Sequence, residues 1–161
     1  MSTTTPLSGR WPGRCCNYWA VLVAAATSLV TSALYYVVFG DAWLTLRGLD
    51  PSTADVTPQP WPMVGQLGHN LVIAFALACV LARLEVRTRK DALRVGLLVW
   101  VGFQAAAVAV SVLHENYPLG LYLIHVGDAL QATLLMVLIL TAWRRDVRRD
   151  VEISPSASTS S

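Results

Sequence analysis

The chain has 161 residues, of which 55% are hydrophobic and 14% are charged, and its formal net charge is +2. A typical soluble domain carries about 25% charged residues, so this composition, with a mean hydropathy of +0.51, excludes an ordinary soluble domain and favours a membrane protein. The small net charge gives no support to nucleic-acid binding. The three cysteines, Cys15, Cys16 and Cys79, form neither a disulfide framework nor a CxxC motif.

Four long apolar segments follow a polar stretch, residues 1–17, that is expected to be disordered. They comprise residues 18–39, 67–84, 95–113 and 119–143. Each is close to the roughly 20 residues that a helix needs to cross the hydrocarbon core. Because none shows the alternation of a barrel strand, each is predicted to be a helix. The predicted fold is therefore all-α, an integral membrane four-helix bundle within residues 18–143.

The connections between these segments differ in length and character. Residues 40–66 contain Pro51, Pro58, Pro60 and Pro62, which no continuous helix tolerates, so a loop is predicted, with residues 42–49 as a short helix at the membrane surface. The basic stretch 85–94 joins the second and third segments, and residues 114–118 leave room only for a tight hairpin. Residues 144–161 are predicted to be a basic stretch followed by a disordered tail.

The basic residues predict the orientation of the bundle. With both termini in the cytoplasm, only Arg47 lies outside, and basic residues in short loops resist translocation. We therefore expect a multi-pass protein of the plasma membrane, in bacteria the inner membrane, with both termini cytoplasmic. The cytoplasmic side then holds Arg10, Arg14, Arg83, Arg87, Arg89, Lys90, Arg94, Arg144, Arg145, Arg148 and Arg149.

Small residues at four-residue spacing indicate where helices touch. Lipid offers no hydrophobic drive for helix association, so close backbone approach through small side chains must supply much of it. Such contacts are expected within one chain or between copies in a homo-oligomer. The stripes are Ala24, Ser28 and Ser32 in the first segment, Ala74, Ala78 and Ala82 in the second, and Gly102 and Ala106 in the third.

Parts of the sequence resemble a known bacterial membrane family. The resemblance lies in the opening NYWAVLVAA at residues 17–25, in ALYY at 33–36, in FGDAW at 39–43, and in YLIHVG at 122–127. On these residues the chain is similar to the family called domain of unknown function 1761, over roughly residues 17–145. The resemblance implies a small four-helix membrane protein, and since the family has no established activity it implies no function.

The fourth segment carries the most informative polar residue, Asp128. It lies nine residues into the segment, about 13 Å deep, where a carboxylate costs on the order of 3 kcal/mol. His125 and Gln131 are three residues away on either side, so they share its helix face. Gln104 in the third segment and Ser28 in the first reach a similar depth. These five residues are the candidate intramembrane polar site.

Two interpretations of this polar site remain open. Intramembrane carboxylates often mark proton or substrate pathways, which favours a proton- or cation-coupled transporter that uses Asp128. Alternatively, a neutral Asp128 could donate a hydrogen bond to Gln104 or Ser28 and only fix the helix packing. Under that interpretation the protein is a non-enzymatic bundle of unknown role.

A third interpretation, that the protein is a membrane metal or redox subunit, rests on the histidines. His69, His114 and His125 all fall in the outer part of the predicted bundle, and imidazoles with a carboxylate can bind zinc, copper or haem. None of them has ligand spacing within one helix, so no metal site and no cofactor are predicted. No catalytic motif is present either, and the expectation is that the protein is not an enzyme.

Overall fold

The structure is a computed structural model that describes residues 17–54, 57, 59–116 and 118–153. The described chain is helical, with α1 (Tyr18–Leu46), α2 (Pro60–Arg83), α3 (Arg89–Val99), a π-helical turn η1 (Trp100–Ala105), α4 (Ala106–Glu115) and α5 (Leu119–Ile153). Four stretches of it are long and apolar enough to cross a membrane: Tyr18–Leu46, Pro60–Arg83, Arg89–His114 and Leu119–Arg144. The predicted all-α fold with four apolar helices is confirmed.

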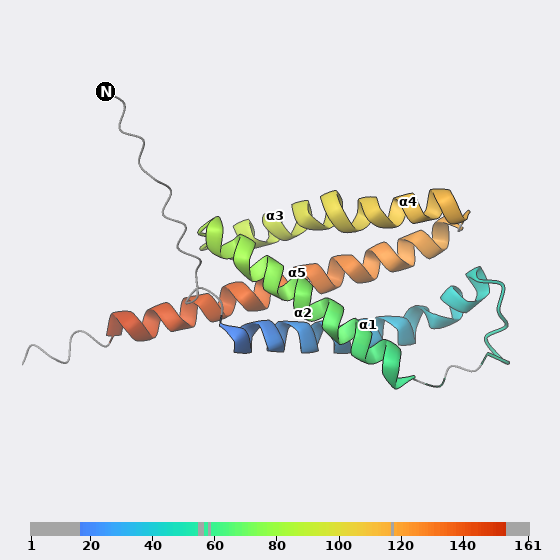
Figure 1. The fold of residues 1–161 in the computed structure, drawn as a ribbon, viewed down its shortest axis with the longest axis horizontal. Helices are drawn as coiled ribbons and strands as arrows, with labels where there is room; N and C mark the ends of the chain where they lie inside the picture. Colours follow the sequence, from blue (N-terminus) through green and yellow to red (C-terminus); the bar gives the residue numbers. More distant parts are fainter. Residues whose placement is uncertain (1–16, 55–56, 58, 117, 154–161) are drawn as a thin grey trace, which may run out of the picture.

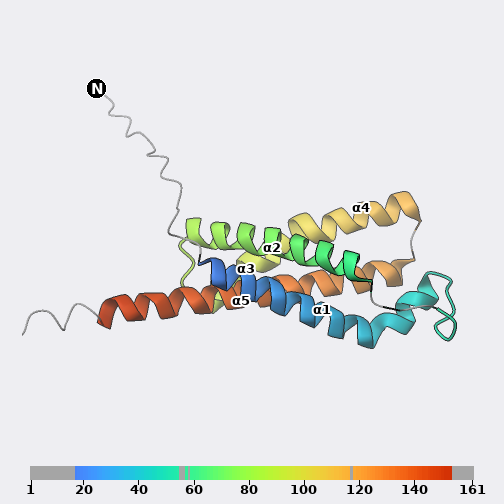
Figure 2. The same cartoon turned by 60° about the horizontal axis from the view of Figure 1, so that its bottom comes forward.

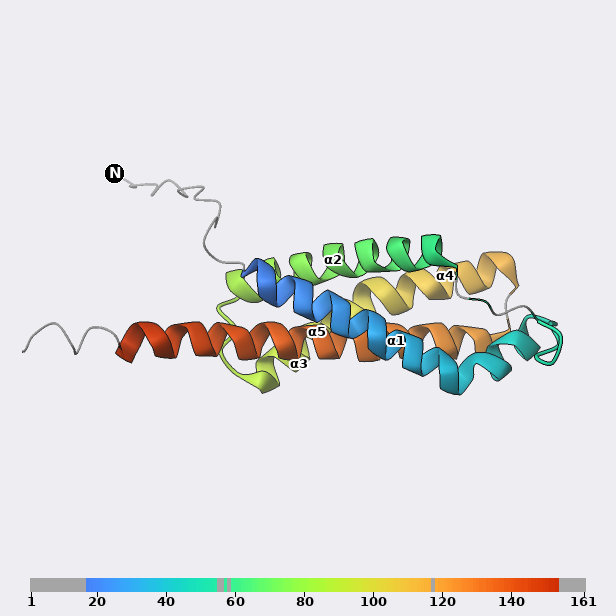
Figure 3. The ribbon, with the colours of Figure 1, turned by 90° about the horizontal axis from the view of Figure 1, so that it is seen from below.

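The four long helices form an elongated bundle (Figure 1). The start of α1, the turn between α2 and α3 and the far part of α5 lie toward one end, and the end of α1 and the α4–α5 turn lie toward the other (Figures 1 and 2). Helix α1 crosses α5 obliquely (Figure 3), and α1, α2 and α3 all contact α5. Below, "inner end" denotes the end with the start of α1 and "outer end" the opposite one.

The first helix is longer than predicted, and the loop after it is shorter. The helix continues through Gly40, which was expected to begin a loop, and ends at Leu46. The chain turns at Gly48, whose φ of +74° suits a residue without a Cβ. After the turn, the Ser52 hydroxyl and backbone N–H both donate to the Asp50 carboxylate, which lowers the pKa of that exposed carboxyl.

The second helix starts seven residues earlier than predicted, and two of the four prolines lie inside it. Pro60 and Pro62 occupy its first turn, where backbone N–H groups have no intrahelical acceptor to lose. The expectation that the prolines exclude a helix was therefore wrong at these two positions.

The last helix also differs from the prediction, because it continues beyond residue 143 to Ile153. Arginine is a good helix former, so a run of arginines that ends an apolar segment need not end the helix. The predicted disorder of residues 1–16 and 154–161 lies outside the described residues.

The packed core occupies the inner half of the bundle. It is built from small and branched side chains of all the long helices: Ala20, Val21, Ala24, Ala25, Ala74, Leu77, Ala78, Leu81, Ala92, Met136, Val137 and Leu140. Two of the predicted stripes supply part of it, because Ala24, Ser28, Ser32, Ala74 and Ala78 are buried, while Ala82 is half-buried.

The third predicted stripe was wrong for contacts within the chain. Gly102 and Ala106 are exposed, and no atom lies within 4 Å of where a Cβ of Gly102 would be. Both follow the start of the π-helical turn, which adds a residue to one helical turn and rotates everything after it. The buried small residues of this span are instead Ala92, Gly96 and Ala105.

Candidate functional site: an intramembrane cavity with one carboxylate

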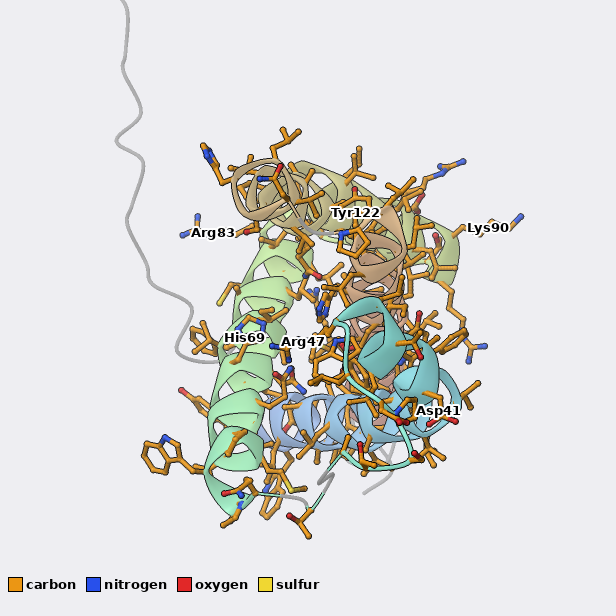
Figure 4. The ribbon with its side chains drawn as sticks, turned by 90° about the vertical axis from the view of Figure 1, so that its right-hand side faces the viewer. Asp41, Arg47, His69, Arg83, Lys90 and Tyr122 are labelled. Carbon is orange, nitrogen blue, oxygen red and sulfur yellow. The ribbon has the colours of Figure 1, made fainter. Side chains whose placement is uncertain are left out.

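The outer half of the bundle contains a cavity of about 700 Å³. It lies where α2 and α4 do not contact each other within the described residues, although each of them contacts α5. Its lining extends from Met63 and Gln66, in the first turns of α2, down to Gln104, Asp128 and Thr133. In an end-on view, His69 of α2 and Arg47 lie side by side in projection, and Tyr122 of α5 lies above them (Figure 4).

Asp128 lies half-buried on α5 and is the carboxylate of this cavity. Its Oδ1 accepts hydrogen bonds from Ser32 Oγ of α1 at 2.7 Å and from Gln131 Nε2 at 2.9 Å. Both bonds reach the same oxygen of a residue that lines the cavity. Gln131 also donates to the Thr31 carbonyl at 3.3 Å and thereby ties this face of α5 to α1.

Ser32, and not Ser28, is the serine that reaches Asp128. Ser28 is fully buried, but its hydroxyl has no hydrogen-bond partner. The predicted Ser28–Asp128 hydrogen bond was therefore wrong, and the actual partner lies one helical turn further along α1. Ser32 had been assigned to the packing stripe alone. It lies four residues after Ser28 on the same face of α1, and this spacing was the one indication that it could meet the carboxylate instead.

Gln104 lines the same cavity but does not bond to Asp128. Its Nε2 donates to Thr133 Oγ1 at 2.9 Å, and the Thr133 hydroxyl donates to the Ala129 carbonyl at 2.8 Å. The predicted Gln104–Asp128 bond was wrong because Gln104 faces α5 at the turn that follows Asp128, where Thr133 meets it. Thr133 was not expected from the sequence, since a buried threonine in an apolar run carries no distinctive signal.

His125 lies one turn from Asp128 and is bonded to a tyrosine of α1. Its Nδ1 and the Tyr36 hydroxyl are 3.0 Å apart, and both side chains line the cavity. Tyr35, Tyr36 and His125 are the titratable groups that interact electrostatically with Asp128. Sequence analysis did not single out Tyr36.

Arg47 is the cation nearest to this group of residues on the outer side. Its guanidinium carbon lies 4.6 Å from the centre of the Trp43 ring, a cation–π distance. Arg47 is also close enough to interact electrostatically with His125, but it does not line the cavity.

The π-helical turn η1 is bonded to α5 at the level of this site. Trp100 Nε1 donates to the Val126 carbonyl at 3.0 Å, and the Tyr122 hydroxyl donates to the Ala105 carbonyl at 3.5 Å. These two bonds join both ends of η1 to the turns of α5 on either side of His125. Single π-helical turns occur often at functional sites, and here the turn sets the position of Gln104 at the cavity wall.

The histidines do not gather into a metal site. His69 and His114 are exposed, and only His69 and His125 line the cavity. Within the described part of the chain, no group of three or more His, Cys, Asp and Glu residues lies close enough to hold a metal ion.

Comparison with known proteins places the chain in a family. The sequence model of the family described as "Protein of unknown function (DUF1761)" matches residues 19–141. This range covers the cavity and all the residues of the polar site. No curated protein and no solved structure matches the chain. The chain belongs to this family of proteins of unknown function, as the resemblance in its first and fourth helices implies.

Proposed function

We propose that this protein is a non-enzymatic membrane carrier that binds a small organic cation, such as a protonated amine, at Asp128. The observation that carries the proposal is a carboxylate with one oxygen held by Ser32 and Gln131 while the residue lines a cavity of about 700 Å³. A carboxylate at this depth is costly, and an ammonium group in the cavity offsets that cost by pairing with it.

Two aromatic side chains support a cationic ligand. Tyr36 and Tyr122 line the cavity together with Asp128, and tyrosine rings attract cations within about 6 Å of the ring centre. Coupling follows from the same carboxylate, because a proton and an organic cation compete for it. The function is then exchange of a cation for a proton, with Asp128 as the shared site.

The proposed location is the plasma membrane, in bacteria the inner membrane, with both termini in the cytoplasm. The support is the charge distribution, since residues 83–94, around the turn between α2 and α3, and the far part of α5 together carry nine of the twelve basic residues. In this orientation the end of the bundle where Arg47 lies faces the outside of the cell. A homo-oligomer remains a prediction.

A purely structural role for Asp128 is the second candidate, and one observation favours it. The Ser32–Asp128 bond joins α1 to α5, so the carboxylate contributes to helix packing in any case. The two candidates differ in what they expect of an amine, because a structural carboxylate gains nothing from one.

Binding of n-butylamine to the detergent-purified protein, measured by isothermal titration calorimetry, tests the proposal. Asp128→Asn keeps the shape of the side chain and removes the charge. It should abolish amine binding and leave the melting temperature close to that of the wild type. Asp41→Asn is the matched control, because Asp41 is exposed and lies away from the centre of the end-on view (Figure 4). Equal binding by Asp128→Asn and the wild type would leave only the structural role.

A further inference from the structure

A second cavity opens beside the first, between α2 and the third membrane-crossing stretch. Its volume is about 440 Å³, and we call it the lateral groove. On α2 it is lined by His69, Ile73, Ala76, Leu77 and Val80. On the opposite side it is lined by Val99, Phe103, Gln104, Ala107 and Val108, with Ala129 of α5 between them.

The lateral groove is continuous with the carboxylate cavity. Five residues line both: His69, Ile73, Gln104, Val108 and Ala129. Ala129 directly follows Asp128 in α5, so the groove begins next to the carboxylate. Apart from His69 and Gln104, which lie at this junction, every residue that lines the groove has an apolar side chain.

The groove faces away from the bundle axis, toward lipid. Phe103 and Val80 at its rim are exposed, with 73% and 37% of their surface accessible. Along α2 it extends from His69 to Val80, roughly 16 Å at the rise of an α-helix. That length is about half of the roughly 30 Å hydrocarbon thickness, which matches a chain that fills one leaflet.

We infer that the cation bound at Asp128 is amphiphilic, and that its apolar chain lies in the lateral groove between α2 and α4. This inference rests on the proposed function, because it names the class of the same ligand: a lipid-soluble amine. Charge complementarity selects the occupant, since an apolar groove that begins next to a carboxylate fits an ammonium headgroup with an alkyl chain. A neutral acyl chain would fill the groove and leave the carboxylate unpaired.

The test compares n-dodecylamine with n-butylamine on variants that narrow the groove. Ala107→Leu adds a branched side chain to the groove wall without touching Asp128. Ala106→Leu is the matched control, because Ala106 is exposed like Ala107 but does not line the groove. The dissociation constants are measured in one detergent, so partitioning of each amine into micelles cancels in the ratio of variant to wild type.

We expect Ala107→Leu to weaken n-dodecylamine binding roughly tenfold, as displacing about two methylene groups from apolar contact would. Binding of n-butylamine, which does not reach along the groove, should change less than about twofold by the same scale. Ala106→Leu should affect neither amine, and Asp128→Asn should weaken both. This pattern would support the inference.

Three other outcomes would overturn it. An equal effect of Ala107→Leu on both amines would place the alkyl chain elsewhere while leaving amine binding at Asp128 intact. Binding of n-dodecanol as tight as that of n-dodecylamine would make the groove a general acyl-chain site. A change in oligomeric mass caused by Ala107→Leu, measured by light scattering, would show that a second copy covers the groove. Failure of the wild type to bind either amine would instead reject the proposed function itself.

Discussion

Ser32 of α1 donates a 2.7 Å hydrogen bond to Asp128 of α5 across the helix interface. The two residues are 96 positions apart in the sequence, and their bond fixes one oxygen of the carboxylate while the residue faces the cavity. The serine one turn earlier, Ser28, is fully buried and has no hydrogen-bond partner. The two serines therefore form a matched pair for mutation.

Ser32→Ala should lower the free energy of unfolding by roughly 0.6 to 1.7 kcal/mol, the range measured for hydrogen bonds between membrane helices. Ser28→Ala removes a hydroxyl that makes no bond, so the stability should stay the same or rise slightly. Unfolding of the purified protein in mixed micelles, followed by circular dichroism, measures both. A larger loss of unfolding free energy for Ser28→Ala than for Ser32→Ala would contradict the assignment of the Asp128 hydrogen bond to Ser32.

Gly96 and Gly102 form a second matched pair, on either side of the start of the π-helical turn. A Cβ on Gly96 would lie 3.0 Å from Val137 Cγ2, whereas one on Gly102 would meet nothing within 4 Å. Because Val137 is fully buried, overpacking in Gly96→Leu should lower the free energy of unfolding by about 1 to 3 kcal/mol. Gly102→Leu should leave the melting temperature nearly unchanged. Equal losses at both positions would mean that η1 does not rotate Gly102 away from the bundle.

The number and order of the helices were predictable because the physical signal is long-range and redundant. Each segment, such as residues 67–84, is a long and mostly apolar run, and only a helix satisfies its backbone groups in lipid. The helix ends were less predictable, since Gly40 and Pro62 are helix breakers in general and are tolerated where they stand. Propensity alone does not tell a half-buried Gly40 or a first-turn Pro62 from a true boundary.

Within the candidate site, only Asp128 and its neighbour on the same helix face, Gln131, could be predicted. Asp128 is conspicuous because a charge is rare in an apolar segment, and Gln131 follows from its helix face. The partners on other helices depend on how those helices are rotated about their axes. The π-helical turn changes that rotation for Gln104, and no residue pattern in Trp100–Ala105 announces it. Tyr36 was missed because its partner His125 lies on another helix, and Thr133 because a threonine in an apolar run carries no distinctive signal.

The orientation of the bundle can be tested with an impermeant maleimide on intact cells. The native cysteines are first replaced by serine, and single cysteines are then introduced at Ser52 and at Lys90, which lie at opposite ends of the bundle. If the termini are cytoplasmic, Ser52→Cys is labelled and Lys90→Cys is labelled only after lysis. The opposite pattern would invert the topology, so that the end where Arg47 lies faces the cytoplasm.

The central claim is that Asp128 is a site shared by an organic cation and a proton, and uptake by proteoliposomes tests it most directly. Tetramethylammonium is the suitable probe, because its fixed charge prevents it from crossing lipid as a neutral base. With an acidic interior and an alkaline exterior, liposomes that contain the wild type or Asp41→Asn should accumulate the labelled cation above the level of empty liposomes. Liposomes with Asp128→Asn of unchanged melting temperature should match the empty ones. Uptake by Asp128→Asn equal to that of the wild type, or no uptake by the wild type, would contradict the account.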